Sequence, residues 1–175
     1  FSIKGNFPRI FFNNSGDREK IIDIKQWGSI AWTSLESAFK GASNLQLTAT
    51  DAPDLSNVTT LKEIFRNCTI FNANINHWDV SNVTNLDSAF YSTSSFNQPL
   101  NDWNTSSVSN MAHMFYGAVV FNQSIGDWST TAVINMGHMF RDARAFNQDI
   151  SDWDTSNVTN MGFMFHFAWQ FNQPI

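Results

Sequence analysis

A period of 25 residues runs from about residue 71 to the C-terminus and limits the possible folds more than any single residue does. Aromatic residues mark it most clearly, because five Phe-Asn pairs and four tryptophans keep this spacing (Phe71, Phe96, Phe121, Phe146, Phe171; Trp78, Trp103, Trp128, Trp153). A fixed period of this length is typical of arrays in which each repeat is one coil that buries its apolar face only against neighbouring coils. The sequence therefore predicts a stack of coils.

The period extends upstream in a weaker form. Trp27 and Phe39 lie 51 residues before Trp78 and Phe90, and the coil between them carries one inserted residue before Pro53. We expect about six coils, near residues 23–45, 46–70, 71–95, 96–120, 121–145 and 146–175. Residues 1–22 lie outside the repeat and are expected to form an N-terminal β cap, with strands over residues 2–4 and 8–12. Because the chain begins without Met and stops inside a coil, we expect a fragment of a longer protein.

Within each coil the apolar pattern changes its period. In the last coil, apolar residues at i, i+3, i+7 and i+10 fit one face of a short helix (Val158, Met161, Phe165, Ala168). Thr residues precede these segments and could cap the first turn (Thr105, Thr130, Thr155). Residues 146–150 fit a short strand. One strand and one short helix per repeat predict an α/β solenoid, a right-handed stack that is similar to leucine-rich repeats.

Charge and composition exclude several functional classes. Charged residues make up 14% of the chain, and the net charge of −5 divides into +1 over residues 1–66 and −6 over residues 67–175. An acidic array without basic clusters argues against nucleic acid as a partner. The longest apolar runs are too short to span a membrane, so we expect no membrane insertion. Cys68 is the single cysteine, so no internal disulfide is possible.

The repeated motif Phe-Asn-Gln-x-Ile/Leu-x-x-Trp, followed by Thr-Ser-x-Val-x-Asn-Met-x-x-Met-Phe, resembles that of the BspA-like repeat surface proteins of bacteria. The resemblance covers roughly residues 23–175. These proteins are similar to leucine-rich repeats with an Ala-Phe-x-x-Cys signature, and Phe65-Arg66-Asn67-Cys68 carries its cysteine. The resemblance implies a modular protein that is extracellular or attached to the cell surface and acts in adhesion. It implies no shared site whose residues could be carried over.

Few residues invite a catalytic or metal-binding interpretation. Cys68 occupies a position that Ala fills in other coils, and we interpret it as a buried small hydrophobe. His113 and His138 lie one coil apart and could share a metal, but no third ligand is evident, so a solvated face is favoured. Enzyme motifs such as H-E-x-x-H, G-x-S-x-G and phosphate-binding glycine loops are missing. We therefore expect no enzyme, no cofactor and no metal site; a metal-dependent enzyme is the least favoured alternative.

The expected function is non-enzymatic binding of an extracellular protein or a glycan. The contact surface is expected along the outward strand row and a column of aspartates (Gln98, Asp102, Gln123, Asp127, Gln148, Asp149, Ser151, Asp152). Like charges on neighbouring strands destabilise a sheet, so the Asp column invites a functional explanation, such as a cation or cationic ligand. The alternative is that each Asp bonds a nearby turn. A second function fits equally well, a structural spacer that projects another domain from the cell. The open last coil also predicts self-association.

Overall fold

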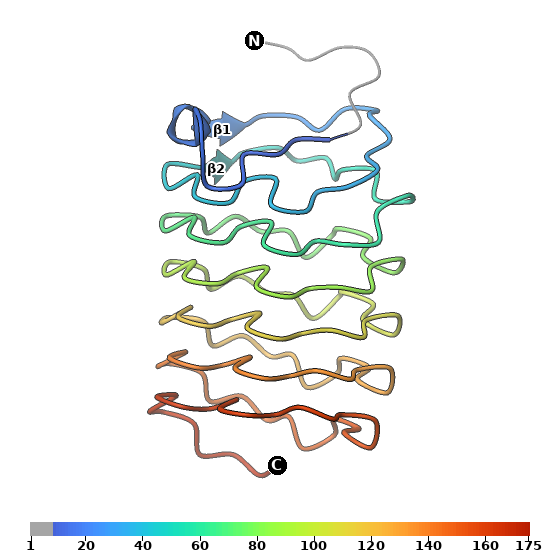
Figure 1. The fold of residues 1–175 in the computed structure, drawn as a ribbon, viewed down its shortest axis with the longest axis vertical. Coiled ribbons are helices and arrows are strands. Elements are labelled where there is room, and N and C mark those ends of the chain that lie inside the picture. Colours follow the sequence, from blue (N-terminus) through green and yellow to red (C-terminus); the bar gives the residue numbers. More distant parts are fainter. Residues whose placement is uncertain (1–8) are drawn as a thin grey trace.

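The computed structural model describes residues 9–175, which form a stack of coils along the long axis of the molecule (Figure 1). Regular secondary structure is sparse and consists of one 3₁₀ turn, η1 (Arg18–Lys20), and two short strands, β1 (Asp23–Ile24) and β2 (Gln46–Leu47). The two strands pair in parallel, with Asp23 opposite Gln46. Farther along, single-residue parallel bridges join each coil to the next at intervals of 25 residues (Thr60, Asn85, Asn110, Asn135, Asn160).

The prediction of an α/β solenoid made of strand–helix coils, in the manner of leucine-rich repeats, is wrong. Within residues 9–175 no α-helix forms, and η1 lies outside the 25-residue repeats. Residues 158–168, expected as a helix, form consecutive turns instead. Residues 146–150, expected as a strand, have no regular secondary structure.

Backbone conformation explains why the helix does not form. Two positions in each coil, four residues apart, adopt the left-handed conformation. From the second coil onward, φ is 55–58° at the first position (Glu63 to Phe163) and 52–68° at the second (Asn67 to Phe167). A right-handed helix cannot continue through such residues. At these positions only Gly41, in the first coil, and Gly117 are glycines, so residue types gave little indication of the left-handed conformation. Consecutive tight turns bring the same apolar positions to one side, which is why the spacing resembled a helix.

Hydrogen bonds in this turn segment run both within a coil and between coils. In residues 111–117 alternate N–H groups donate to the next coil, as Met111 N–H does to the Asn135 carbonyl (2.9 Å) and Phe115 N–H to the Met139 carbonyl (2.9 Å). Of the intervening N–H groups, those of Met114 and Tyr116 close four-residue turns with the carbonyls of Met111 and His113, and that of Ala112 donates to Asn110 Oδ1. The Thr residues expected as helix caps also bridge coils, because Thr105 Oγ1 donates to the Ser129 carbonyl and Thr130 Oγ1 to that of Asp154.

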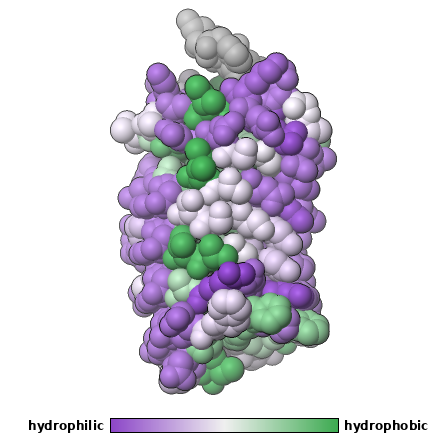
Figure 2. All heavy atoms as spheres, turned by 90° about the vertical axis from the view of Figure 1, so that its left-hand side faces the viewer, coloured by the Kyte–Doolittle hydropathy of each residue, from purple (hydrophilic) through white to green (hydrophobic). Residues whose placement is uncertain are grey.

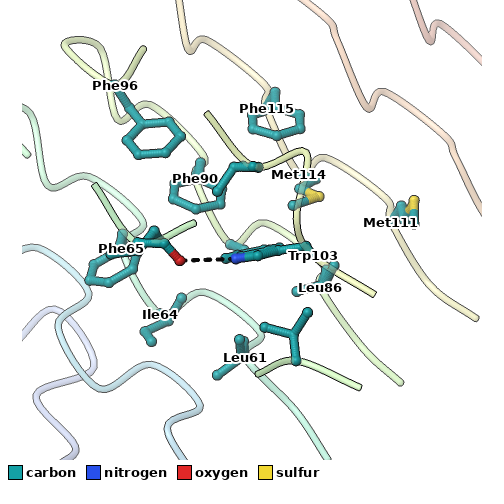
Figure 3. Packing of buried hydrophobic residues seen from close by; sticks show 14 of the residues in the cluster. Leu61, Ile64, Phe65, Leu86, Phe90, Phe96, Trp103, Met111, Met114 and Phe115 are labelled. Atoms are coloured by element: carbon teal, nitrogen blue, oxygen red, sulfur yellow. Dashed lines mark hydrogen bonds between the residues drawn. The ribbon is translucent and has the colours of Figure 1, made fainter. Parts of the chain in front are cut away.

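The core consists of the columns that the period predicted. Phe115 packs between Phe90 and Phe140, with ring centroids 5.5 and 5.7 Å apart, and Phe121 stacks on it at 4.0 Å. The Trp column lies beside these rings, and Figure 3 shows Trp103 among Leu86, Phe90 and Met114. Cys68 is fully buried, and its thiol lies 3.0 Å from the Phe39 carbonyl, which confirms its interpretation as a core residue.

Residues 12–19 contact the first full coil. The N–H groups of Phe12, Asn13 and Asn14 donate to the carbonyls of Ala38, Ser37 and Lys40. In the second coil the equivalent carbonyls of Ile64 and Arg66 accept from Phe39 and Gly41, so this segment takes the place of a preceding coil. The strand expected over residues 2–4 lies outside the described residues, and the one over residues 8–12 shows only an isolated bridge at Arg9.

The surface of the stack is mostly polar. Figure 2 shows one long edge, where apolar side chains gather in patches between hydrophilic ones. Exposed apolar residues lie along the array and at its C-terminal end, where Phe163 is 63% exposed (Ile22, Ile70, Val120, Met161, Phe163, Phe167, Trp169). Across residues 9–175 we find no helix with the length and apolar character that a membrane span requires.

Candidate functional site

The predicted glutamine contacts take part in a ladder that joins the coils. Each Asn that follows a core Phe accepts two hydrogen bonds from the next coil, one from the backbone N–H of the next Asn and one from the amide of the following Gln. At Asn97 Oδ1 these bonds measure 2.9 Å from Asn122 N and 3.0 Å from Gln123 Nε2. Gln98 and Gln148 donate in the same way to Asn72 and Asn122. The three Gln amides therefore contribute to stacking.

The predicted aspartate column does not form one uniform site. Asp102 Oδ2 accepts from Asn76 Nδ2 at 2.7 Å, while Asp127 and Asp152 are exposed at equivalent positions. Asp149 accepts from the N–H of Ser151 at 2.9 Å, a bond between neighbouring residues that lowers the pKa of the carboxyl. Thus the row provides exposed carboxylates. No cluster of three or more potential metal ligands exists among residues 9–175.

The structure instead reveals a shallow groove on the turn face, with a volume of about 430 Å³, which we call the Tyr–His groove. Its residues come from four successive coils and are mostly charged or aromatic (Lys62, Glu63, Arg66, Asp87, Ser88, Tyr91, His113, Tyr116, His138, Arg141). The left-handed positions contribute Glu63, Ser88, His113 and His138. The consecutive turns that replaced the expected helix therefore build this groove.

A column of tyrosines and arginines forms one side of the groove. Tyr91 and Tyr116 stack with ring centroids 4.5 Å apart. The Arg66 guanidinium lies 4.0 Å from the centre of the Tyr91 ring, and that of Arg141 lies 5.4 Å from the centre of the Tyr116 ring. Burial raises the pKa of Tyr91, and the neighbouring Tyr116 raises it further, so the Tyr91 hydroxyl remains protonated at neutral pH.

A column of histidines forms the other side. His113 and His138 stack with centroids 4.9 Å apart and planes 6° from parallel, and Phe163 continues the column 5.3 Å beyond His138. Burial lowers the pKa of His138, and electrostatic interactions with His113, Arg141 and His166 lower it further. Parallel rings of this kind do not aim two nitrogens at one point, so the arrangement does not resemble a shared metal site.

Most charges in the groove are paired. Lys62 lies 3.3 Å from Asp87, whose other oxygen lies 3.5 Å from His113 Nδ1. Glu63 contacts Arg66 at 2.9 Å and Lys40 at 2.7 Å. Burial disfavours the ionised form of Glu63, but hydrogen bonds from Lys40 and Ser37 outweigh it and the pKa is lowered. Arg141 differs, because within residues 9–175 it forms no salt bridge and lies 3.4 Å from His138 Nδ1.

A family model described as "Mycoplasma protein of unknown function, DUF285" matches residues 33–142 and 107–175. The chain belongs to this family. The family is bacterial, and its description assigns no function. No curated protein and no solved structure matches the chain.

Sequence reasoning found part of the groove and missed the rest. His113 and His138 attracted attention as a stacked pair, whereas Tyr91, Tyr116 and Arg141 did not. A signal existed, since these positions differ from coil to coil within an otherwise regular repeat: Arg66, Tyr91, Tyr116, Arg141 and His166 share one column.

Proposed function

We propose that this chain is a non-enzymatic binding module of a bacterial extracellular or cell-surface protein, and that the Tyr–His groove contacts a protein or a glycan. The resemblance of the repeated motif to that of the BspA-like surface proteins supports an extracellular location and a role in adhesion. The groove replaces the Gln–Asp row as the favoured contact surface, since the Gln side chains of that row are occupied in stacking.

One observation supports the proposal above others. In the ladder columns the same residue type recurs because each copy makes the same bond to its neighbour, as in the Asn97–Asn122 pair. In the groove columns the side chains vary while the backbone bonds remain regular, as His113 N–H and His138 N–H each donate to the next coil at 2.9 Å. The coil therefore does not require these particular side chains, and their charged and aromatic character is available for a ligand.

The first experiment is a binding screen of the intact protein against immobilised glycans and matrix proteins. Two variants distinguish the surfaces. Tyr116→Ala alters the groove, and a triple Asp102→Asn, Asp127→Asn, Asp152→Asn change alters the predicted aspartate column with minimal change of shape. We expect Tyr116→Ala to weaken binding at least about tenfold, as for a residue near the centre of an interface. Binding lost only in the triple variant would contradict the groove assignment.

A structural spacer is the second candidate. The continuous aromatic columns favour it, since stacked rings such as Phe96 and Phe121 (6.0 Å) join successive coils into one body. A spacer binds nothing through the groove, but its length matters. If the screen finds no ligand and deletion of one internal coil reduces the reach of an attached domain, the spacer is preferred.

A further inference from the structure

The ring faces of Tyr91 and His138 in the Tyr–His groove are already covered. Tyr91 has the Arg66 guanidinium on one side and Tyr116 on the other, at 4.0 and 4.5 Å. His138 likewise lies between His113 and Phe163, at 4.9 and 5.3 Å. A ligand can therefore reach ring edges, hydroxyls and ring nitrogens, but it cannot stack flat on these rings. Aromatic edges carry the positive part of the ring quadrupole, which favours electron-rich ligand atoms.

Arg141, which forms no salt bridge within residues 9–175, lies at one end of this column. Arg141 presents a planar guanidinium beside Tyr116 and His138, while the neighbouring Arg144 is bound to Asp142 at 2.8 Å. A guanidinium offers five donors in a fixed fork that matches the two oxygens of a carboxylate. Residues 67–175 carry a net charge of −6, so a half-buried arginine without an acidic partner is exceptional there.

We propose that the Tyr–His groove binds a carboxylate-bearing glycan, with the sugar carboxylate paired to Arg141 and the sugar hydroxyls bonded to the edges of Tyr116 and His138. This inference rests on the proposed function and specifies its ligand. The groove is shallow and lined by polar groups, so it provides no deep apolar pocket in which a peptide side chain could anchor. Sugar hydroxyls, in contrast, match the Tyr hydroxyls and imidazole nitrogens.

The test measures binding of the intact protein to three soluble polymers by calorimetry. The probes are polygalacturonate, its methyl ester, in which the carboxylates are masked, and polyglutamate, which carries carboxylates on a peptide. Two variants accompany them: Arg141→Gln removes the proposed anchor, and Arg144→Gln removes a neighbouring arginine outside the groove. Thermal unfolding of each variant confirms that it is folded.

We expect polygalacturonate to bind and its methyl ester to bind at least about tenfold more weakly, because charge-assisted hydrogen bonds are lost. Arg141→Gln should weaken polygalacturonate binding by a similar factor and Arg144→Gln by less than about twofold. Equal effects of the two substitutions would overturn the proposal, as would the absence of polygalacturonate binding. Polyglutamate bound as tightly as polygalacturonate would overturn the glycan assignment and indicate an acidic peptide. A neutral glycan or a protein whose binding depends on Tyr116 but not on Arg141 would overturn this inference and leave the proposed function standing.

Discussion

The indole N–H of Trp128 donates a hydrogen bond to the backbone carbonyl of Leu100, 28 residues earlier, over 2.9 Å. The same bond joins Trp103 to Ile75 at 3.0 Å (Figure 3) and Trp153 to Ile125 at 3.1 Å. Each tryptophan thus fills the core and satisfies a buried carbonyl of the preceding coil. Trp78 is buried as well, but its indole nitrogen has no hydrogen-bond partner among residues 9–175. The residue 28 positions before Trp78 is Thr50, in the coil that carries the inserted residue.

This difference between the tryptophans gives a matched pair of substitutions. Trp128→Phe removes ring atoms and the indole donor, leaving the Leu100 carbonyl with the Trp103 N–H as its remaining donor, and should lower the free energy of unfolding by about 2–4 kcal/mol. Trp78→Phe removes the same atoms but no hydrogen bond and should be less destabilising by about 1 kcal/mol or more. Urea unfolding measures both values. Equal losses would mean that the indole hydrogen bond contributes nothing.

The thiol of Cys68 should be unreactive in the folded protein. Burial raises its pKa to about 12 from 9.0, so the thiolate that reacts with alkylating reagents is scarce at neutral pH. We expect no modification of the native protein at pH 8 and complete modification of one thiol in denaturant. Since the folded pKa is the higher one, the stability that this group contributes is complete below about pH 9 and decreases as the pH rises toward 12. Rapid labelling of the native protein would contradict this burial.

The Asn ladder should contribute strongly to stacking. Asn97 Oδ1 accepts from both Asn122 N and Gln123 Nε2, so Asn97→Ala leaves two half-buried donors without their acceptor. A loss of about 1–3 kcal/mol in the free energy of unfolding is expected. Asn97→Asp keeps an acceptor oxygen and serves as the control, with a smaller expected loss. Equal stability of Asn97→Ala and Asn97→Asp would mean that the hydrogen bonds accepted by Asn97 Oδ1 do not stabilise the stack.

Acid should destabilise the N-terminal part of the stack. The N–H groups of Trp27 and Gly28 donate to the Asp51 carboxylate and lower its pKa below 3.8. Because the pKa of Asp51 is lower in the folded protein, its contribution to stability is complete above the unfolded pKa and is lost as the pH falls through the folded pKa. We expect the urea midpoint to decrease below about pH 4, and less so in Asp51→Asn, which is already uncharged. An identical pH dependence in both proteins would exclude Asp51 as a source of the effect.

The sequence predicted which residues are buried better than it predicted how the backbone runs. The Phe and Trp columns, from Phe65 and Trp78 onward, are core as expected, because burial depends on the period alone. The helix was wrong because its apolar spacing also fits consecutive turns, and the left-handed conformation of residues such as His113 and His138 has no residue-type signature.

The candidate site was predicted incompletely for the same reason. The Gln amides were placed on an exposed row, yet Gln123 bonds to Asn97 of the preceding coil. Such a bond between coils cannot be derived from the pattern within one coil. The groove depends on where Tyr116 and His138 lie in space. Consecutive turns determine these positions, whereas the apolar spacing predicted a helix.

The most direct test of the central claim is amide chemical-shift mapping by NMR with the ligand that the screen selects. The account predicts that perturbed amides cluster in the turn segments around residues 87–91, 113–116 and 138–141, which line the groove. Amides around residues 98–102, 123–127 and 148–152 should be unaffected. Perturbation of the second set without the first would contradict the groove and restore the Gln–Asp row as the contact surface.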